Sequence, residues 1–139
     1  MNIDGVNTGV VIDHIQAGKS MQIYELMELN KMKCCVAIIQ NVESVKYGQK
    51  DIIKVDGELN LDYKMLGYID PNITVNIVKD GKLQEKIHLD LPDTLTNVIK
   101  CKNPRCITSI EQEIPHKFKL TNKEKRIYRC IYCDAEHSE

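Results

Sequence analysis

Four of the six cysteines in this chain form two close pairs near its C-terminal end. The pairs are Cys101-x4-Cys106 and Cys130-x2-Cys133. A short turn between two cysteines places both thiolates on one side of a metal ion, and zinc prefers four such soft ligands in a tetrahedral arrangement. Free thiols and disulfides are the alternatives, and two pairs so close together favour zinc over both. Four cysteine ligands leave no position for water, so we predict one structural Zn²⁺ that folds the C-terminal segment.

The other two cysteines, Cys34 and Cys35, lie in an apolar segment that is predicted to form a strand. Adjacent residues of a strand point to opposite faces of a sheet. We therefore expect buried or half-buried structural thiols here rather than a reactive pair.

The balance of charges limits the partners of the chain. Its 19 basic and 20 acidic residues give a net charge of −1, which indicates no overall attraction to nucleic acid or to an anionic membrane. No secretory signal is visible, and the longest apolar run, residues 34–39, is far shorter than the roughly 20 residues that a membrane helix needs. We expect a cytoplasmic protein, in which reduced cysteines bind metal more often than they form disulfides.

The first 90 residues alternate between β-branched segments and segments of helical periodicity. Ser20 is a candidate cap for the first helix, and the stripe Met21, Tyr24 and Met27 is expected to face the core. Helices and antiparallel strands in this order predict an α+β sandwich. Strands are predicted at residues 9–15, 33–42, 50–56, 73–78 and 83–89, and helices at residues 21–29 and 59–69.

A change in composition divides the chain at Leu91-Pro92. Four of the six cysteines and a run of basic residues follow this point. We therefore expect two domains, residues 1–91 and residues 92–139, of which the second contains the metal.

Several polar residues of the N-terminal part have two interpretations. Asp13-His14 resembles half of an acid–base pair, but no Ser or Cys nucleophile with oxyanion-hole chemistry accompanies it, so we do not expect an enzyme. His14 is either a hydrogen-bonded structural histidine or a ligand contact. Lys50 and Lys54 are either solvated charges or anion contacts. Near the cysteines, His116 and His137 are interpreted as bystanders because four thiolates complete a zinc site.

Four segments occur in a familiar order: residues 9–15, 48–54, 74–76 and 128–133. Together they resemble the regulatory chain of aspartate carbamoyltransferase, and the resemblance covers nearly the whole chain. It implies an α+β fold with an N-terminal ferredoxin-like α/β sandwich as the allosteric domain. A small C-terminal antiparallel β zinc domain contacts the catalytic chain.

The resemblance also implies a non-catalytic function in pyrimidine biosynthesis. The allosteric domain would bind CTP, which inhibits, and ATP, which activates, with UTP assisting CTP in some members. Regulatory chains would pair as dimers and tether two catalytic trimers into a dodecamer of six catalytic and six regulatory chains. No nucleic acid and no membrane would be involved.

The family's nucleotide site is transferred to this chain residue by residue. Lys54 and Lys86 would meet the triphosphate as compact cations, and Asp13 and Asn76 would contact ribose or base. Backbone groups near the N-terminus would read the exocyclic amino group that cytosine and adenine share. The full expected set is Ile3, Asp4, Gly5, Val6, Asp13, His14, Lys50, Lys54, Asn76, Val78, Leu83 and Lys86.

A zinc-ribbon protein that binds nucleic acid is the alternative. The basic stretch from Lys117 to Arg129, next to the cysteine turns, favours it. The neutral net charge and the small number of aromatic residues for base stacking argue against it.

Overall fold

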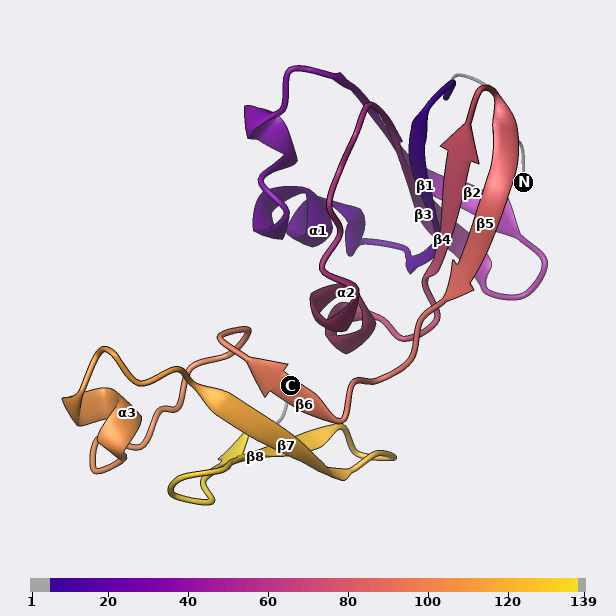
Figure 1. The fold of residues 1–139 in the computed structure, drawn as a ribbon. Coiled ribbons are helices and arrows are strands. Elements are labelled where there is room, and N and C mark those ends of the chain that lie inside the picture. Colours follow the sequence, from indigo (N-terminus) through magenta and orange to yellow (C-terminus); the bar gives the residue numbers. More distant parts are fainter. Residues whose placement is uncertain (1–5, 138–139) are drawn as a thin grey trace. The chain divides into compact units, whose positions relative to one another are not determined.

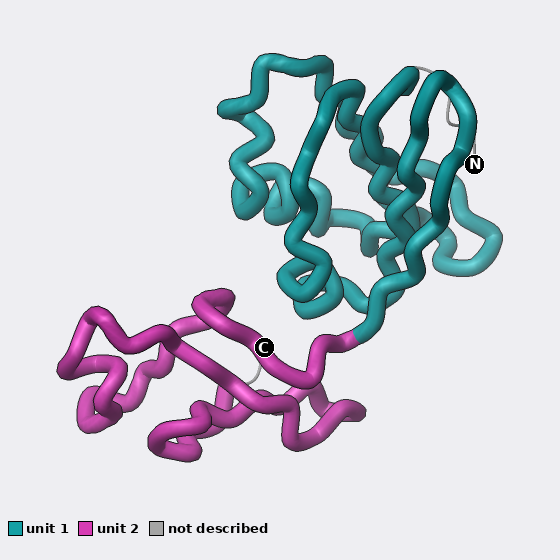
Figure 2. The backbone as a smooth tube through the Cα atoms, in the orientation of Figure 1, with its two compact units in different colours: residues 1–90 teal, residues 91–139 magenta. Residues whose placement is uncertain are grey.

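The computed structural model describes residues 6–137 and divides into two compact units, residues 1–90 and 91–139 (Figure 2). Each unit has its own antiparallel sheet, which confirms the predicted α+β class (Figure 1). Within the described residues, no helix is long and apolar enough to cross a bilayer.

The N-terminal unit is a five-stranded sheet with short helices on one side. Its strands follow the order β2-β3-β1-β4-β5, and every pairing is antiparallel. The first four of these strands, with α1 and α2 on one face, form the ferredoxin-like arrangement, and β5 extends the sheet beyond β4 (Figure 1). The elements are β1 (Gly9–Gln16), α1 (Ser20–Leu26), η1 (Leu29–Lys31), β2 (Cys35–Ser44), β3 (Gly48–Asp56), α2 (Tyr63–Ile69), β4 (Thr74–Lys79) and β5 (Lys82–His88).

Both faces of this sheet bury aliphatic side chains. On the helical face, the alternate residues of β1, β3 and β4 pack against α1 and α2. On the opposite face, which we call the open face, a smaller cluster contains Val11, Ile52 and Val78 together with Val6. The helical-face core consists of Val10, Ile12, Ile15, Ile23, Leu29, Ile53, Val55, Leu66, Ile69, Ile73 and Val75.

Helix α1 begins differently from the prediction. Ser20 is not its cap: the N-cap is Lys19, and Ser20 is a buried first residue whose N–H donates to the carboxylate of Asp51. The predicted core stripe is wrong at Met21, which is 44% exposed, whereas Ile23 is completely buried. Because the carboxylate of Asp51, distant in sequence, receives the first N–H of the helix, this group needs no cap from a neighbouring residue.

Both helices are shorter than their apolar periodicity predicts. The first ends at Leu26, and Glu28 adopts a left-handed conformation with φ of 53° that separates it from η1. The second begins only at Tyr63, because the Asp62 carboxylate accepts the N–H of Met65 and caps the helix there. The apolar residues before Asp62 still pack against the core, but from a loop rather than from a helix.

The thiol prediction for Cys34 and Cys35 is only half right. Strand β2 starts at Cys35, so Cys34 precedes the strand. Cys34 is half-buried and packs against the helical-face core, as expected. Cys35 is exposed, which contradicts the expectation, because it begins β2, the outer strand of the sheet.

The C-terminal unit is a small four-stranded sheet in the order β6-β7-β8-β9. Its apolar interior is small: Leu95, Phe118 and Tyr128 are buried beside the cysteines. The Tyr128 hydroxyl donates to the carbonyl of Pro92 at 2.7 Å and so fixes the start of the unit. The elements are β6 (Thr94–Thr96), α3 (Ile107–Ile110), β7 (Lys117–Asn122), β8 (Ile127–Cys130) and β9 (Glu136–His137).

Candidate functional site

The four predicted cysteine ligands meet in the C-terminal unit. Their sulfur atoms all lie within 4.8 Å of one another. The Sγ atoms of Cys101 and Cys133 are 3.5 Å apart, and those of Cys106 and Cys130 are 3.7 Å apart. Zn–S bonds of about 2.3 Å in a tetrahedron require sulfur–sulfur separations of about 3.8 Å. The donor set and its spacing therefore fit a tetrahedral thiolate site.

Local backbone hydrogen bonds build the two turns that present these sulfurs. In the first turn, the N–H of Cys106 donates to the carbonyl of Asn103 at 3.0 Å. In the second, the N–H of Asp134 donates to the carbonyl of Cys130 at 2.9 Å, just where β8 ends. Each turn thus places its pair of thiols on one side of the cluster, as the cysteine spacing predicts.

The thiols differ strongly in acidity. Burial raises the pKa of Cys101 to about 12. The Thr108 hydroxyl, which donates to the Cys106 sulfur at 3.1 Å, lowers the pKa of Cys106 to about 6. Burial also raises the pKa of Cys130. Crowded, buried thiols resist joint ionisation, and a divalent cation among them supplies the compensating charge.

Sequence reasoning missed two residues that support this cluster. Thr108 donates to a cysteine sulfur, and His116 accepts the N–H of Cys101 through its Nδ1 at 3.0 Å. His116 therefore fixes the backbone of one cysteine, and the bystander interpretation missed this contact. The sequence feature that could have indicated Thr108 is its position two residues after Cys106. No such feature indicates His116, which only the fold brings next to Cys101.

Strand register brings several predicted nucleotide residues together in the N-terminal unit. Val11 of β1 pairs with Lys54 of β3 on one side and with Asn76 of β4 on the other. Asn76 in turn pairs with Lys86 of β5. Paired residues of antiparallel strands project to the same face, so these four residues form one row. Because Val11 belongs to the open-face cluster, the row crosses the face opposite the helices.

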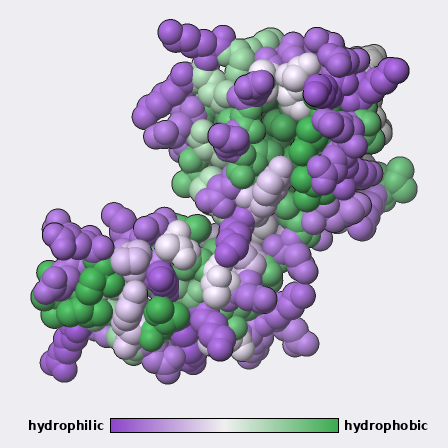
Figure 3. All heavy atoms as spheres, in the orientation of Figure 1, coloured by the Kyte–Doolittle hydropathy of each residue, from purple (hydrophilic) through white to green (hydrophobic). Residues whose placement is uncertain are grey.

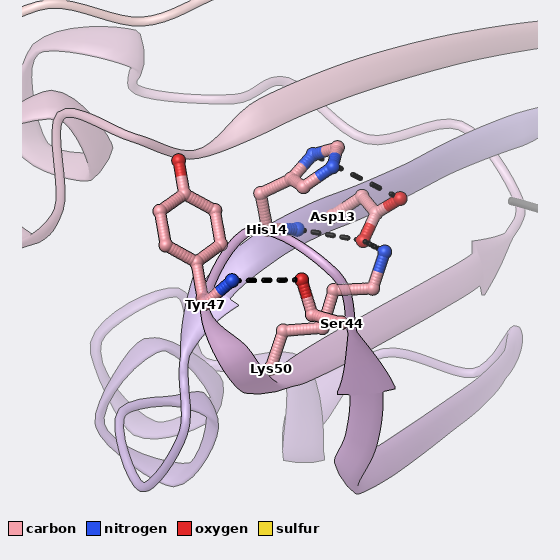
Figure 4. Close-up of polar contacts among 5 residues, drawn as sticks. All are labelled: Asp13, His14, Ser44, Tyr47 and Lys50. Atoms are coloured by element: carbon pink, nitrogen blue, oxygen red, sulfur yellow. Dashed lines mark hydrogen bonds and ion pairs between the residues drawn. The ribbon is translucent and has the colours of Figure 1, made fainter.

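A buried ion pair lies beside this row. The Lys50 ammonium is 3.0 Å from Asp13 Oδ1, and the Asp13 carboxylate is 1% exposed (Figure 4). Asp13 also accepts the backbone N–H of His14, which adopts a left-handed conformation with φ of 60° where the β1–β3 register shifts. Asp13 therefore holds both the lysine and the bulge of β1 in place.

His14 projects from this bulge toward the turn between β2 and β3. Its ring meets the Tyr47 ring edge-on, with centroids 6.3 Å apart (Figure 4). Burial lowers the pKa of His14, and its Nδ1 is buried without a hydrogen-bond partner in the described residues. The Tyr47 N–H donates to the Ser44 hydroxyl at 3.3 Å and shapes the turn. The Nδ1 atom of His14 lies 3.9 Å from Asp13 Oδ2, and the His14 side chain is 31% exposed, so the exposed part of the imidazole is available to a ligand.

The remaining predicted contacts are distributed around the open face. Val78 is buried there and pairs with Leu83 of β5, which is 50% exposed. Val6 packs in the same cluster, so the chain enters the unit at the open face. The predicted residues Ile3, Asp4 and Gly5 lie outside the described residues.

A cavity of about 610 Å³ adjoins the row over β2 and β3. Its lining combines cationic and apolar side chains, which suits a ligand with an anionic part and a flat, less polar part. The cationic side is formed by Lys46, Lys50 and Lys54, with His14 and Glu43 also in the lining, and the apolar side by Ile39, Val42, Val45 and Ile52.

Comparison with known proteins matches both units to a single family. Residues 1–90 match the family model described as the allosteric domain of the aspartate carbamoyltransferase regulatory chain. Residues 93–139 match the metal binding domain of the same chain. The chain belongs to the family of aspartate carbamoyltransferase regulatory chains. The resemblance predicted from the sequence is therefore confirmed.

Relatives at high identity span almost the whole chain. A regulatory chain of Clostridium botulinum is 50% identical over 138 residues, 99% of this chain and 94% of the relative. One from Clostridium acetobutylicum is 49% identical over 134 residues, 96% of this chain and 92% of the relative. One from Bifidobacterium longum is 39% identical over 136 residues, 98% of each. Like the family, the chain is a non-catalytic regulatory subunit with an allosteric and a metal-binding domain.

Proposed function

We propose that the chain binds CTP and ATP on the open face of the N-terminal sheet and transmits their effects, inhibiting and activating, to a catalytic partner. The observation that carries this proposal is the row formed by Lys54, Val11, Asn76 and Lys86. Two lysines from different strands on either side of a buried amide can hold a triphosphate while the amide reads the sugar or base.

Each residue of the row and its neighbours has a separate role in this proposal. Lys54 and Lys86 bind phosphate oxygens, and Asn76 hydrogen-bonds to ribose or base. Asp13 holds Lys50 at 3.0 Å and therefore positions that ammonium. The His14 side chain, which is 31% exposed, contacts the same ligand. Val78 and Leu83 provide apolar contact with the sugar or base.

The cavity of about 610 Å³ next to the row gives a place for the assisting nucleotide, UTP. It adds Lys46 to the lysines already named, so its wall offers a cation to a second anionic ligand, although Glu43 also lines it. Two polyanions side by side repel each other, and shared cations reduce that repulsion.

We propose that the metal of the C-terminal unit is one structural Zn²⁺. The four thiolates of Cys101, Cys106, Cys130 and Cys133 would hold it. Four sulfur ligands fill a tetrahedral shell, so the ion stabilises the fold and does not activate water. The family model describes a metal binding domain over this segment, in accord with the sulfur cluster.

Apolar side chains exposed around the cluster form the docking surface for the catalytic chain in this proposal. Such side chains are visible on the surface of the C-terminal unit (Figure 3). Large aliphatic and aromatic residues exposed on a small unit mark a surface that a partner covers. The residues are Ile107 at 40%, Ile110 at 67%, Ile131 at 53% and Tyr132 at 42% exposure.

Strand β2 provides the surface for pairing with a second regulatory chain. It spans Cys35–Ser44 and lies at the end of the sheet, so one side of it has no neighbouring strand among the described residues. Open strand edges pair readily with other chains, and Ile39 on this strand is 40% exposed. Dimers of this kind would tether two catalytic trimers into a dodecamer.

The regulatory mechanism follows from differential affinity. A nucleotide that binds one arrangement of the regulatory dimer better than another shifts the catalytic trimers toward low or high activity. Couplings of this type amount to about 1–3 kcal/mol. The metal unit transmits the effect because it contacts the catalytic chain.

Co-purification with the cognate catalytic chain tests these proposals together. We expect a stable complex with about one zinc per regulatory chain and an activity that falls when CTP is added. A metal-bearing chain that fails to bind the catalytic trimer would contradict the proposal. If the chain instead bound RNA or DNA with a steep salt dependence, the nucleic-acid alternative would replace it.

A further inference from the structure

The Thr108 hydroxyl lies directly against one sulfur of the cysteine cluster. Thr108 is 4% exposed, and its Oγ1 donates to Cys106 Sγ at 3.1 Å. Cys106 is the N-cap of α3, so Thr108 occupies the first turn of that helix. The helix therefore directs a buried hydroxyl at the metal site from a fixed backbone.

We infer that Thr108 is a positioning residue that strengthens metal retention by hydrogen bonding to the Cys106 thiolate. The inference rests on the proposed zinc site. Four thiolates around one Zn²⁺ leave a net charge of −2 in a largely buried place, and a donated O–H offsets part of the charge on one sulfur. It also fixes the side-chain rotamer in which Cys106 faces the other three sulfurs.

The cysteines of the cluster differ in their exposure to solvent, and this difference makes the contact between Thr108 and Cys106 important. Cys106 is 1% exposed, whereas Cys133 is half-buried. The buried thiolate has little access to water as a hydrogen-bond donor, so a protein donor must replace it. Thr108 supplies that donor, while the more accessible sulfur of Cys133 can be solvated.

A neighbouring hydroxyl provides a matched control. Ser109 follows Thr108 on α3, but its Oγ donates to the carbonyl of Asn103 at 2.7 Å and not to sulfur. A role of Thr108 limited to shaping the turn would be shared with Ser109. A role through the thiolate would belong to Thr108 alone.

The test measures metal affinity and electronic spectra of the full chain in four forms: wild type, Thr108→Val, Thr108→Ser and Ser109→Ala. Zinc affinity is measured by competition with a chromophoric chelator, and the thiolate-to-metal charge-transfer band is recorded after Co²⁺ substitution. Thr108→Val keeps the side-chain shape but removes the donor. We expect it to bind zinc about tenfold more weakly.

We also expect the Co²⁺ band of Thr108→Val to move to lower energy, because the sulfur lone pair is no longer stabilised by a hydrogen bond. Thr108→Ser should retain both affinity and band position, and Ser109→Ala should match the wild type. Unchanged affinity and spectrum in Thr108→Val would overturn the inference. Equal weakening in Ser109→Ala, or a tenfold loss in Thr108→Ser, would also overturn it. Failure of the wild type to bind zinc would instead refute the proposed metal site itself.

Discussion

The two units of the chain reach a folded state by different means. The N-terminal unit packs eleven buried aliphatic residues between a five-stranded sheet and its helices. The C-terminal unit has strands as short as two residues, and among its described residues only Leu91, Leu95, Phe118 and Tyr128 are large buried apolar side chains besides the cysteines. Units of about 50 residues rarely gain enough from apolar burial alone, and a metal commonly supplies the difference. The N-terminal unit should therefore tolerate loss of the metal, whereas the C-terminal unit should not.

The largest expected effect comes from removing one sulfur. Cys133→Ser or Cys106→Ser should unfold the C-terminal unit and abolish docking on the catalytic chain, because metal binding and folding are coupled there. Amide hydrogen exchange should show loss of protection in β7 and β8, with β1 and β3 unchanged. Normal assembly by either mutant would show that the unit does not depend on the metal.

Truncation of a buried side chain in the N-terminal core should have the opposite pattern: it should destabilise the N-terminal unit and leave the metal unit unchanged. Ile12 is completely buried at the centre of the helical-face core. Ile12→Ala should lower the free energy of unfolding of this unit by about 2–5 kcal/mol while the zinc content stays the same. Ile110→Ala, at a position that is 67% exposed, is the control and should change stability by less than about 0.5 kcal/mol. A loss of zinc in the Ile12 variant would show that the two units do not fold independently.

A buried carboxylate links three parts of the N-terminal unit. Asp51 accepts the backbone N–H groups of Gly18, Ser20 and Asn41 at 3.1, 3.3 and 3.0 Å. Burial alone would raise the pKa of Asp51, but these hydrogen bonds and one from the Ser20 hydroxyl outweigh it, so its pKa is lowered. Asp51→Asn should cost about 1.5–3 kcal/mol at neutral pH, because an ionised acceptor is lost.

The pH dependence of this effect has a definite sign. The pKa of Asp51 is lower in the folded chain than its ordinary value of 3.8, so its contribution is complete above that pH. The contribution is lost as the pH falls below 3.8 toward the folded pKa. The difference in unfolding free energy between wild type and Asp51→Asn should therefore shrink over this range, as followed by amide exchange in β1 and β3. A difference that stays constant to lower pH would exclude this linkage.

The smallest expected effect concerns the nucleotide row. Lys54→Ala should weaken CTP binding by about tenfold, or ~1.4 kcal/mol, while assembly stays intact. Lys31→Ala is the matched control, because Lys31 lies in η1 and its ammonium pairs with Glu28 at 3.0 Å. Calorimetric titration with CTP measures both. Unchanged CTP binding and inhibition in the Lys54 variant would remove this residue from the site.

Much of the architecture could be predicted from local patterns in the sequence. The alternation of β-branched residues predicted the order of strands and helices, and the cysteine spacing predicted the ligand turns. Helix boundaries were less predictable, because Asp62 caps α2 three residues after Leu59, where the apolar pattern begins. The exposure of Met21 also escaped prediction, because a seven-residue helix can turn either Met21 or Ile23 inward.

The cysteine cluster and the class of fold could be inferred from the sequence alone, because both depend on spacings of a few residues along the chain. The common row of Lys54, Asn76 and Lys86 could be seen only in the folded chain, since strand register depends on hydrogen bonding between strands distant in sequence. The same holds for Asp51, whose partners come from two other segments, residues 18–20 and Asn41. Thr108 is near Cys106 in sequence, but its role depended on the helix that turns its hydroxyl toward sulfur. Short-range patterns in the sequence therefore identify the candidate residues, whereas contacts between segments distant in the chain determine which of them lie together.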